Sequence, residues 1–279
     1  MERTMKRYVK LFLSVTFAVC LCVLLYRAYD GWKSAGANEE ALQIAGMSGE
    51  PERPDPLSEE PEQPDSPSEE PGLLPAESLP EEAAHLARLN LAALQAVNED
   101  VIGWLEIPGT EISYPVLQGP DNEFYLGHNW KREPSRSGSV FLEQTNSRDL
   151  TGFHLIVYAH RKRDGTMFGS LKYYSEPEYC RQHPAIYLVS EDSVRRYEVF
   201  AAYKAGVTSM VYRLDLEERG LEEEFLDFCL ESSEIDTGVV PEPDNQVLTL
   251  STCTGQGYSS RWVVQGTLRG QYARASAGD

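Results

Sequence analysis

The chain has few residues of the types that form disulfides or bind transition metals: 5 cysteines and 5 histidines among 279 residues. Cys20 and Cys22 lie in an apolar run, where cysteine packs like other small hydrophobic side chains. Three cysteines remain, and if they are exported this odd number leaves at least one unpaired, candidate reactive thiol. Cys180 and Cys229 are either buried thiols or a pair. No cysteine and histidine cluster has zinc spacing, so no metal is expected.

Positive charge is also scarce. The chain has 25 Lys and Arg against 44 Asp and Glu, a formal net charge of −19. Nucleic-acid-binding domains present a basic face, and the absence of one here argues against nucleic acid as a partner. The acidity is concentrated, because residues 38–82 hold 14 acidic residues and only one basic residue. We therefore assign much of the net charge to one segment and not to a surface for cationic partners.

Only one long apolar run is present, over residues 11–26, and it carries no charge. Four basic residues precede it, at positions 3, 6, 7 and 10. By the positive-inside rule, the N-terminus is expected in the cytoplasm and the rest of the chain outside the cell. The small residues 34–37 resemble a signal-peptide cleavage site but lie well beyond the run. The sequence therefore predicts that residues 1–30 form a cytoplasmic tail and an uncleaved transmembrane anchor.

Residues 31–80 have little apolar content and are rich in Pro, Glu and Ser, with Ser-Glu-Glu-Pro at 58–61 and again at 68–71. Such a segment buries too little apolar surface to offset its chain entropy. It is predicted to be a disordered, extended stalk. We therefore expect residues 81–279 to form the folded domain, and residues 1–80 to be dispensable for its fold and turnover.

The folded part is predicted to be mainly β. Apolar periodicity indicates a helix over 81–98, a short one over 167–174 and a longer one over 214–232. Eight strands are expected, at 101–107, 112–116, 139–143, 153–159, 185–190, 195–207, 247–252 and 261–268. Strands and helices do not alternate in βαβ units. This pattern favours a closed or sandwich-like β domain with helical insertions.

Cys253 is the strongest candidate nucleophile. It ends the apolar strand 247–252 and opens a loop that begins Thr-Gly, so the strand would hold the sulfur while the loop leaves it accessible. Local sequence alone also fits a buried cysteine that merely packs. A thiol has a reference pKa of about 8.5 and is mostly protonated at neutral pH, so a catalytic cysteine needs a base or cation nearby.

His160 is the best-placed partner for such a thiol. It ends the strand 153–159 and precedes a polar turn, the same kind of position as that of Cys253. His128 is its serious rival, because it too lies beside a polar turn. Acyl transfer also needs a donor for the developing oxyanion. Arg261 begins the strand after the loop 254–260, which would bring its guanidinium to the same rim, although an isolated arginine is usually a surface residue.

These segments resemble the signature motifs of sortases. Thr249-Leu250-Ser251-Thr252-Cys253 followed by Arg261-Trp262-Val263-Val264 resembles their cysteine and arginine motifs, and Tyr158-Ala159-His160 resembles their histidine motif. Class B sortases in particular are similar at 103–107, at 109–116 and at 137–142. Ala159 is a departure, since glycine is more usual before the histidine. The resemblance covers about residues 85–270.

The resemblance implies an eight-stranded sortase β-barrel with an N-terminal helix and a long helix between the sixth and seventh strands. Cys253 would attack the threonine carbonyl of a sorting signal and form a thioester. His160 would protonate the leaving amine, and Arg261 would bind the substrate backbone or the oxyanion. Candidate substrate-binding residues are Ser251, Thr252 and Tyr258. No cofactor is implied, and residues 81–279 would be the catalytic domain.

The implied partners are sorting-signal peptides of secreted surface proteins, with an amine of the cell-wall peptide or of a pilin as acceptor. A membrane contact through the N-terminal helix is expected as well. Two other readings stay open. A cysteine hydrolase of wall peptides would use the same thiol and histidine but release its product to water, and a non-catalytic adhesion domain would not depend on Cys253.

Overall fold

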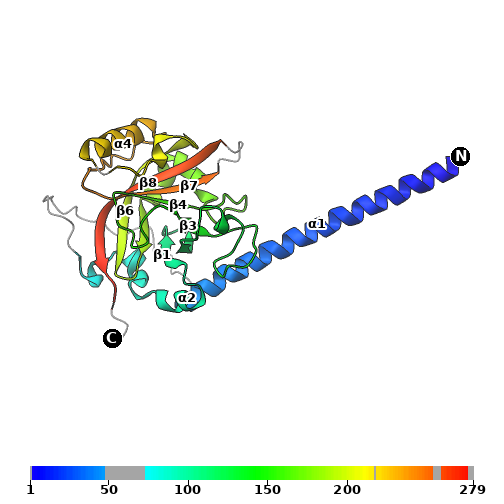
Figure 1. The fold of residues 1–279 in the computed structure, drawn as a ribbon, viewed down its shortest axis with the longest axis horizontal. Helices are drawn as coiled ribbons and strands as arrows, with labels where there is room; N and C mark the ends of the chain where they lie inside the picture. The colour runs from blue at the N-terminus through cyan, green and yellow to red at the C-terminus, as the bar shows by residue number, and fades with distance from the viewer. Residues whose placement is uncertain (1, 48–72, 217, 254–258, 276–279) are drawn as a thin grey trace.

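The computed structural model describes residues 2–47, 73–216, 218–253 and 259–275. Its eight strands are β1 (Val101–Glu106), β2 (Ser113–Leu117), β3 (Val140–Leu142), β4 (His154–Tyr158), β5 (Ala185–Val189), β6 (Ser193–Gly206), β7 (Val247–Cys253) and β8 (Ser260–Ala273). They close into one barrel in the order β1-β2-β3-β4-β7-β8-β6-β5 (Figure 1). Most neighbours are antiparallel, but β2–β3 and β4–β7 are parallel. The predicted mainly-β barrel is confirmed.

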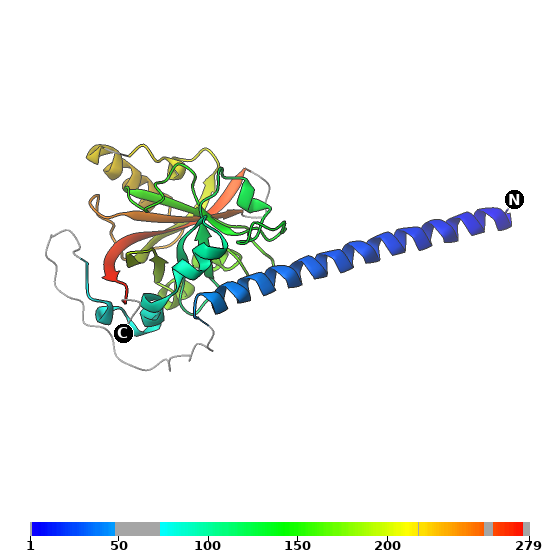
Figure 2. The same cartoon turned by 60° about the horizontal axis from the view of Figure 1, so that its bottom comes forward.

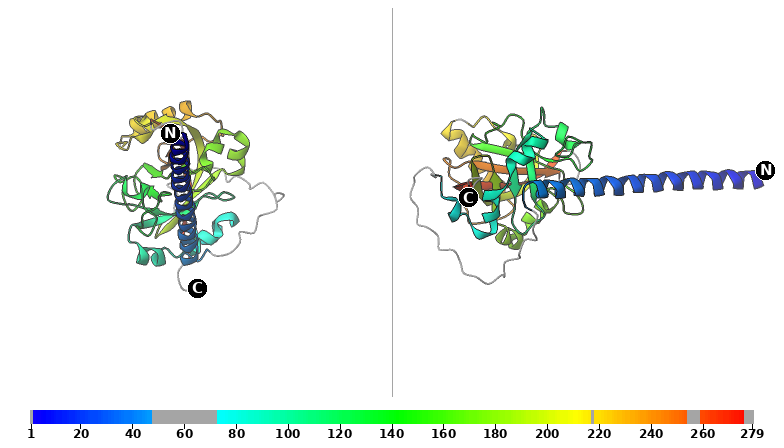
Figure 3. Two further views of the ribbon diagram at one scale, coloured as in Figure 1. Left: turned by 90° about the vertical axis from the view of Figure 1, so that its right-hand side faces the viewer. Right: turned by 90° about the horizontal axis from the view of Figure 1, so that it is seen from below.

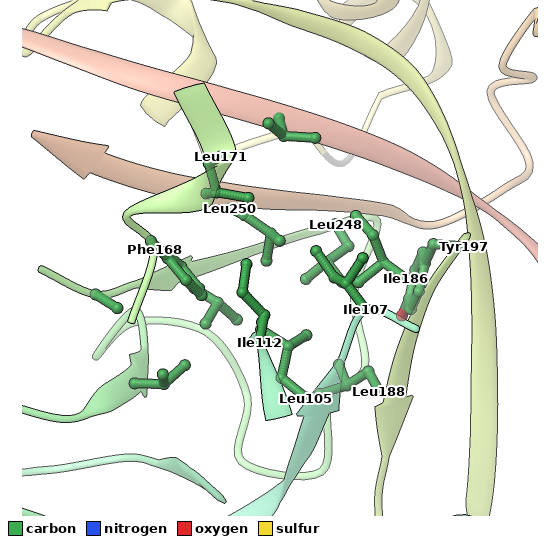
Figure 4. Close-up of a cluster of buried hydrophobic side chains, with 14 of the residues drawn as sticks. Leu105, Ile107, Ile112, Phe168, Leu171, Ile186, Leu188, Tyr197, Leu248 and Leu250 are labelled. Atoms are coloured by element: carbon green, nitrogen blue, oxygen red, sulfur yellow. The ribbon is translucent and has the colours of Figure 1, made fainter. Parts of the chain in front are cut away.

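The barrel interior is packed with aliphatic and aromatic side chains. Leu105 of β1, Leu188 of β5 and Leu248 of β7 meet there, and Phe168 and Leu171 join them from outside the strands (Figure 4). All five are fully buried. Side chains alternate between the two faces of a strand, so the outward-facing apolar side chains of the barrel must be buried by other elements. The helices provide this cover.

The helical segments are α1 (Glu2–Ile44), η1 (Ala76–Ser78), η2 (Glu81–Arg88), α2 (Leu91–Val97), η3 (Phe124–Leu126), η4 (Ser170–Ser175), α3 (Pro177–Gln182), η5 (Met210–Tyr212) and α4 (Arg219–Ser232), where η marks a 3₁₀ helix. The helix predicted over 81–98 is thus two segments. Asn90 separates them and caps α2 by accepting a hydrogen bond from the Ala93 amide at 3.1 Å. α4 lies between β6 and β7 in the chain and begins later than the predicted position 214.

Helix α1 is longer than the sequence predicted. It continues without a break through residues 31–44, which were expected to belong to an extended stalk, and its N-terminal part projects away from the barrel (Figures 1 and 2). Residues 12–44 form a helix long and apolar enough to cross a membrane. Near its C-terminal end, Ala37 and Ala41 of α1, and Ala45 just after it, are buried at a spacing of four residues, which puts them on one face packed against the domain. This tertiary contact explains why a segment of weak apolar content is helical. Residues 48–72 of the predicted stalk lie outside the described part of the chain.

A buried polar network crosses the barrel wall at His154. Its Nδ1–H donates to the Arg213 carbonyl at 2.9 Å, so Nε2 accepts from the Thr249 hydroxyl at 2.8 Å. The Gln265 amide donates to the same hydroxyl oxygen at 3.0 Å, and the Tyr203 hydroxyl donates to the Gln265 carbonyl oxygen at 2.9 Å. Burial lowers the pKa of His154 to about 4, because the charged ring would be desolvated. The fold therefore holds His154 neutral.

We predict that His154 makes the protein less stable in mild acid. The folded pKa is below the unfolded value of 6.5, so the unfolded state binds more protons between these values. The contribution of neutral His154 to the free energy of unfolding is fully present above pH 6.5. It is lost as the pH falls towards 4, by up to about 3 kcal/mol. Denaturant unfolding of wild type and His154→Gln at several pH values measures it. The stability difference between them should shrink with acid, and a constant difference would contradict the prediction.

His85 supplies a control of opposite sign. Its Nε2 lies 2.9 Å from Oε1 of Glu106, and this hydrogen bond raises the pKa of His85. A group with a raised pKa contributes stability below its unfolded pKa and loses it as the pH rises through the folded value. The difference between wild type and His85→Gln should therefore shrink towards alkaline pH. The side chain is 45% exposed, so the change should be smaller than that at His154.

Candidate active site

The parallel pairing of β4 with β7 brings His160 and Cys253 together. Tyr158 of β4 is opposite Ser251 of β7, and His160 and Cys253 each lie two residues beyond that pair. The contact continues past the paired residues. The Ala159 amide donates to the Ser251 carbonyl at 3.4 Å, and the Thr252 hydroxyl donates to the Ala159 carbonyl at 2.7 Å. The two residues therefore occupy equivalent positions at the ends of neighbouring strands.

Arg261 reaches the same rim from the other side of β7. In the antiparallel pairing of β7 with β8, Cys253 is opposite Arg261. The guanidinium is half-buried, and its Nη1 donates to the Ser260 carbonyl at 3.3 Å. Burial and the Glu143 carboxylate raise the pKa of Tyr158, while the positive charge of Arg261 acts to lower it. Arg261 is thus close enough to act electrostatically on the end of β4, two residues before His160.

The imidazole of His160 is held by a backbone carbonyl. Its Nε2 lies 2.8 Å from the Leu126 oxygen, which can only accept, so Nε2 carries a hydrogen. Nδ1 is then the nitrogen left to gain or release a proton. The backbone of His160 is fixed as well, because its carbonyl accepts from the Phe168 amide at 3.0 Å across the turn that follows. Both the tautomer and the position of the ring are defined.

Gly138 makes room for this ring. Its φ is +61°, in the region that favours glycine. A Cβ at this position would lie 2.6 Å from the Tyr125 carbonyl oxygen and 3.0 Å from Cδ2 of His160. Any other residue would therefore push against the loop backbone or the imidazole. Leu126 was not singled out from the sequence, because a backbone carbonyl leaves no mark in it. Gly138 lies in the segment 137–142 that resembles class B sortases, but no role was predicted for it.

His128 occupies a different environment. Its ring stacks on Phe124 with centroids 4.1 Å apart, and its Nδ1 lies 2.8 Å from the Phe124 carbonyl oxygen. His128 follows η3 and has no strand pairing that brings it level with Cys253; its isolated bridge is to Pro134. The pairing thus aligns His160, and not its rival, with the cysteine.

Two of the predicted substrate-binding residues are directed into the protein. Ser251 and Thr252 are 1% and 3% exposed, and the Ser251 hydroxyl is 2.9 Å from that of Tyr212. Tyr258 lies outside the described residues. Tyr212 of η5 was not singled out from the sequence; its ring stacks on that of Tyr158 with centroids 6.5 Å apart, beside the end of β4.

The other cysteines outside α1 do not pair. Cys180 and Cys229 are free and buried, and burial raises the pKa of each thiol to about 11. A buried thiol with a raised pKa is a poor nucleophile. Within the described ranges, no group of three or more His, Cys, Asp or Glu side chains is arranged to hold a metal ion.

Comparison with known proteins agrees with the geometry of this rim. The sortase domain family matches residues 105–269, which is more than half of the chain, and the protein belongs to the sortase family. It is a cysteine transpeptidase of that family. Its similarity extends to proteins named sortase B. The one from Listeria monocytogenes is 34% identical over 183 residues, covering 65% of this chain and 74% of that protein.

Solved structures of sortase B share the fold. The Staphylococcus aureus sortase B–substrate complex has a TM-score of 0.61 and 31% identity, over 64% of this chain and 84% of that one. Bacillus anthracis sortase B in complex with AAEK1 has a TM-score of 0.66 and 28% identity, over 86% of this chain and 98% of that one. The predicted class B resemblance is confirmed.

We predict that His160, and not His128, serves Cys253. His160→Ala should lower cleavage of a sorting peptide by at least about 10²-fold, the lower range for loss of a general acid. Cys253 should still react with a small electrophile, because the thiol remains. His128→Ala is the matched control and should be mild. Peptide cleavage and thiol alkylation, measured for both variants at several pH values, test the prediction. If His128→Ala lost cleavage while His160→Ala kept it, the assignment would be reversed.

Proposed function

We propose that this sortase cleaves a sorting signal of secreted surface proteins after threonine and transfers the acyl group to an amine of the cell wall. The observation that carries the proposal is the pairing of β7 with both β4 and β8, because it brings Cys253 beside His160 and opposite Arg261. This pairing supports the proposed roles of nucleophile, proton donor and cation for the three residues at one barrel rim. The sortase B–substrate complex among the similar structures supports a peptide substrate.

In the first half-reaction the Cys253 thiolate attacks the threonine carbonyl carbon, and the carbonyl oxygen becomes an oxyanion. The C–N bond then breaks, and the imidazolium of His160 gives its Nδ1 proton to the leaving amine. The product is a thioester on Cys253. The hydrogen bond from Nε2 to the Leu126 carbonyl holds the Nε2 proton within the protein. The Nδ1 proton is therefore the one that is transferred to the leaving amine.

In the second half-reaction an amine attacks the thioester carbonyl. Neutral His160 accepts a proton from the attacking nitrogen, the C–S bond breaks, and the thiolate of Cys253 is released. The amide product leaves the enzyme in its starting charge state. Arg261 serves both steps, since an oxyanion forms twice at the same carbon, and a preorganised donor stabilises it without reorganisation.

We assign positioning roles to Ser251 and Thr252. Their hydroxyls bond to Tyr212 and to the Ala159 carbonyl, so they tie the end of β7 to η5 and to the residue before His160. The sequence-based proposal of direct substrate contact is thereby refined to support of the strand ends. Tyr258 remains a proposed substrate-binding residue.

We propose that α1 anchors the enzyme with its N-terminus in the cytoplasm and its barrel outside the cell. Basic residues precede the apolar part of the helix, as the positive-inside rule requires. Tyr26, Tyr29 and Trp32 are exposed where the apolar part ends, which suits the membrane–water interface. Substrates that have crossed the membrane would then reach the barrel.

Two alternative outcomes use the same chemistry. A pilin amine in place of a wall amine would make the enzyme a polymerase of pilus subunits, and water would make it a cysteine hydrolase of wall peptides. Mass spectrometry of the full chain incubated with candidate sorting peptides tests the thioester. Adding a candidate amine tests the acceptor. A ligated peptide whose yield depends on the amine supports transpeptidation, whereas hydrolysis alone at saturating amine would contradict it.

We predict that Arg261→Lys is nearly as damaging as Arg261→Ala. Lysine keeps the charge but lacks the planar fork that can hold the oxyanion and a second acceptor together. Loss of one oxyanion donor typically costs about 10²–10³ in rate. The turnover number for a sorting peptide, measured for both variants, checks the prediction. Near-normal turnover by Arg261→Lys would show that charge alone suffices, and full activity of Arg261→Ala would remove the residue from the site.

A further inference from the structure

The C-terminal part of α1 contacts an irregular segment of the barrel, residues 124–139, which we call the brace loop. The four contacts are Trp130 Nε1–H to the Ala37 carbonyl at 2.6 Å, Lys131 Nζ to Glu40 at 2.6 Å, Ser135 Oγ to Ser34 Oγ at 2.9 Å, and Glu133 to Lys33 Nζ at 3.2 Å. The C-terminal part of α1 lies against the domain, whereas its N-terminal part projects away from it (Figure 1 and the right panel of Figure 3). The helix thus contacts the domain immediately after its apolar part.

The contact is packed as well as polar. Trp130 is 4% exposed and belongs to one buried cluster with Ala37 and Ala41, which are 6% and 0% exposed. A tryptophan buried against a helix contributes both apolar area and a satisfied N–H. Without α1, this ring would face water and its N–H would lose its partner. We infer that α1 is part of the folded domain here.

The brace loop also holds His160. Leu126 of the loop accepts the hydrogen bond from Nε2 of His160, and Gly138 lies against the same ring. Lys162, two residues after His160, donates to the Ser137 hydroxyl at 2.7 Å. One side of the loop therefore contacts the catalytic imidazole while the other side contacts α1.

Ser135 connects the two sides. Its hydroxyl meets Ser34 of α1, and its amide donates to the Gly127 carbonyl at 2.9 Å, one residue from Leu126. Its hydroxyl also accepts from the Ser137 amide at 3.2 Å. Two hydrogen bonds and a peptide unit thus separate α1 from the carbonyl that orients the imidazole. The loop has little regular structure apart from η3, so these bonds define its shape.

The barrel domain also holds the middle of the loop. Asn98 donates to the Trp130 carbonyl at 2.6 Å, and Arg132 donates to Asp100 at 2.7 Å. These bonds would keep the loop folded if α1 were displaced. We therefore expect loss of α1 to shift the loop by a small distance and not to unfold it.

We propose that the face of α1 that contacts the brace loop, between Lys33 and Ile44, is a positioning element for His160 that acts through the loop. The inference rests on the proposed function for its effect on turnover. It departs from the expectation that residues 1–80 are dispensable for turnover, because residues of α1 complete the support of the catalytic ring. The anchor of the enzyme and the geometry of its proton donor are then parts of one packed unit.

The test compares Ala37→Glu with Ala35→Glu in the full chain in lipid nanodiscs. Ala37 is buried against the loop, whereas Ala35 is exposed on the same helix, so the two variants share their chemistry and differ in the face that carries the charge. A carboxylate buried at position 37 should displace α1. We expect kcat to fall about tenfold with KM unchanged, because misplacement of a catalytic group by about 1 Å can cost as much as about 10²-fold. Ala35→Glu should match wild type.

Two readouts do not depend on turnover. Hydrogen exchange of residues 125–139 should quicken in Ala37→Glu only, and ¹⁵N shifts of the neutral His160 ring should show loss of the pure Nε2–H tautomer in that variant only. The proposal would be overturned if Ala37→Glu showed the same hydrogen exchange in the loop as wild type. It would also be overturned if exchange were faster but kcat and the ring tautomer were those of wild type. If the wild-type protein turned over no sorting peptide, the proposed function would fail. Hydrogen exchange and the ring tautomer would still test whether α1 positions His160 through the brace loop.

Discussion

The parallel pairing of β4 with β7 is the constraint on which the site depends. Parallel neighbours need a long connection, and here the chain builds β5, β6 and α4 before it returns to lie beside β4. The return sets His160 level with Cys253, and the hairpin-like pairing of β7 with β8 then adds Arg261. A shift of β7 by one residue would move the cysteine to the other face of the sheet, so the proposed mechanism requires this register.

The buried side chains around this pairing explain why the register holds. Along β4 and β7, apolar residues fill the barrel while His154 and Thr249 form a polar contact on the other face. A buried polar group must find its partner, and a shift of β7 by one residue would move Thr249 to the other face and separate the pair. The network therefore favours this register, at the cost of a dependence on pH. The same strands carry the proposed catalytic residues at their ends.

The surroundings of His160 show how a site gains precision from backbone groups. The ring is oriented by the Leu126 carbonyl, and Gly138 leaves space for it. Both belong to an irregular segment that depends on tertiary contacts for its shape, including those from α1. Catalytic groups need supporting contacts to stay within a fraction of an ångström of a productive position. In this protein that support extends to the helix that carries the apolar, membrane-compatible segment.

The sequence by itself located the strands and identified the family. Apolar runs and turn residues located all eight strands within a few residues, and the motifs around Cys253, His160 and Arg261 identified the family. Tertiary structure decided what depends on distant partners. β8 extends past the predicted residue 268 because β6 continues beside it, and residues 31–44 are helical because the domain covers one face of them. The strand order and the contact of His160 with the Leu126 carbonyl likewise arise only when segments far apart in the chain meet. Local sequence encodes the periodicity of a strand or helix, but it does not encode which distant segment packs against it.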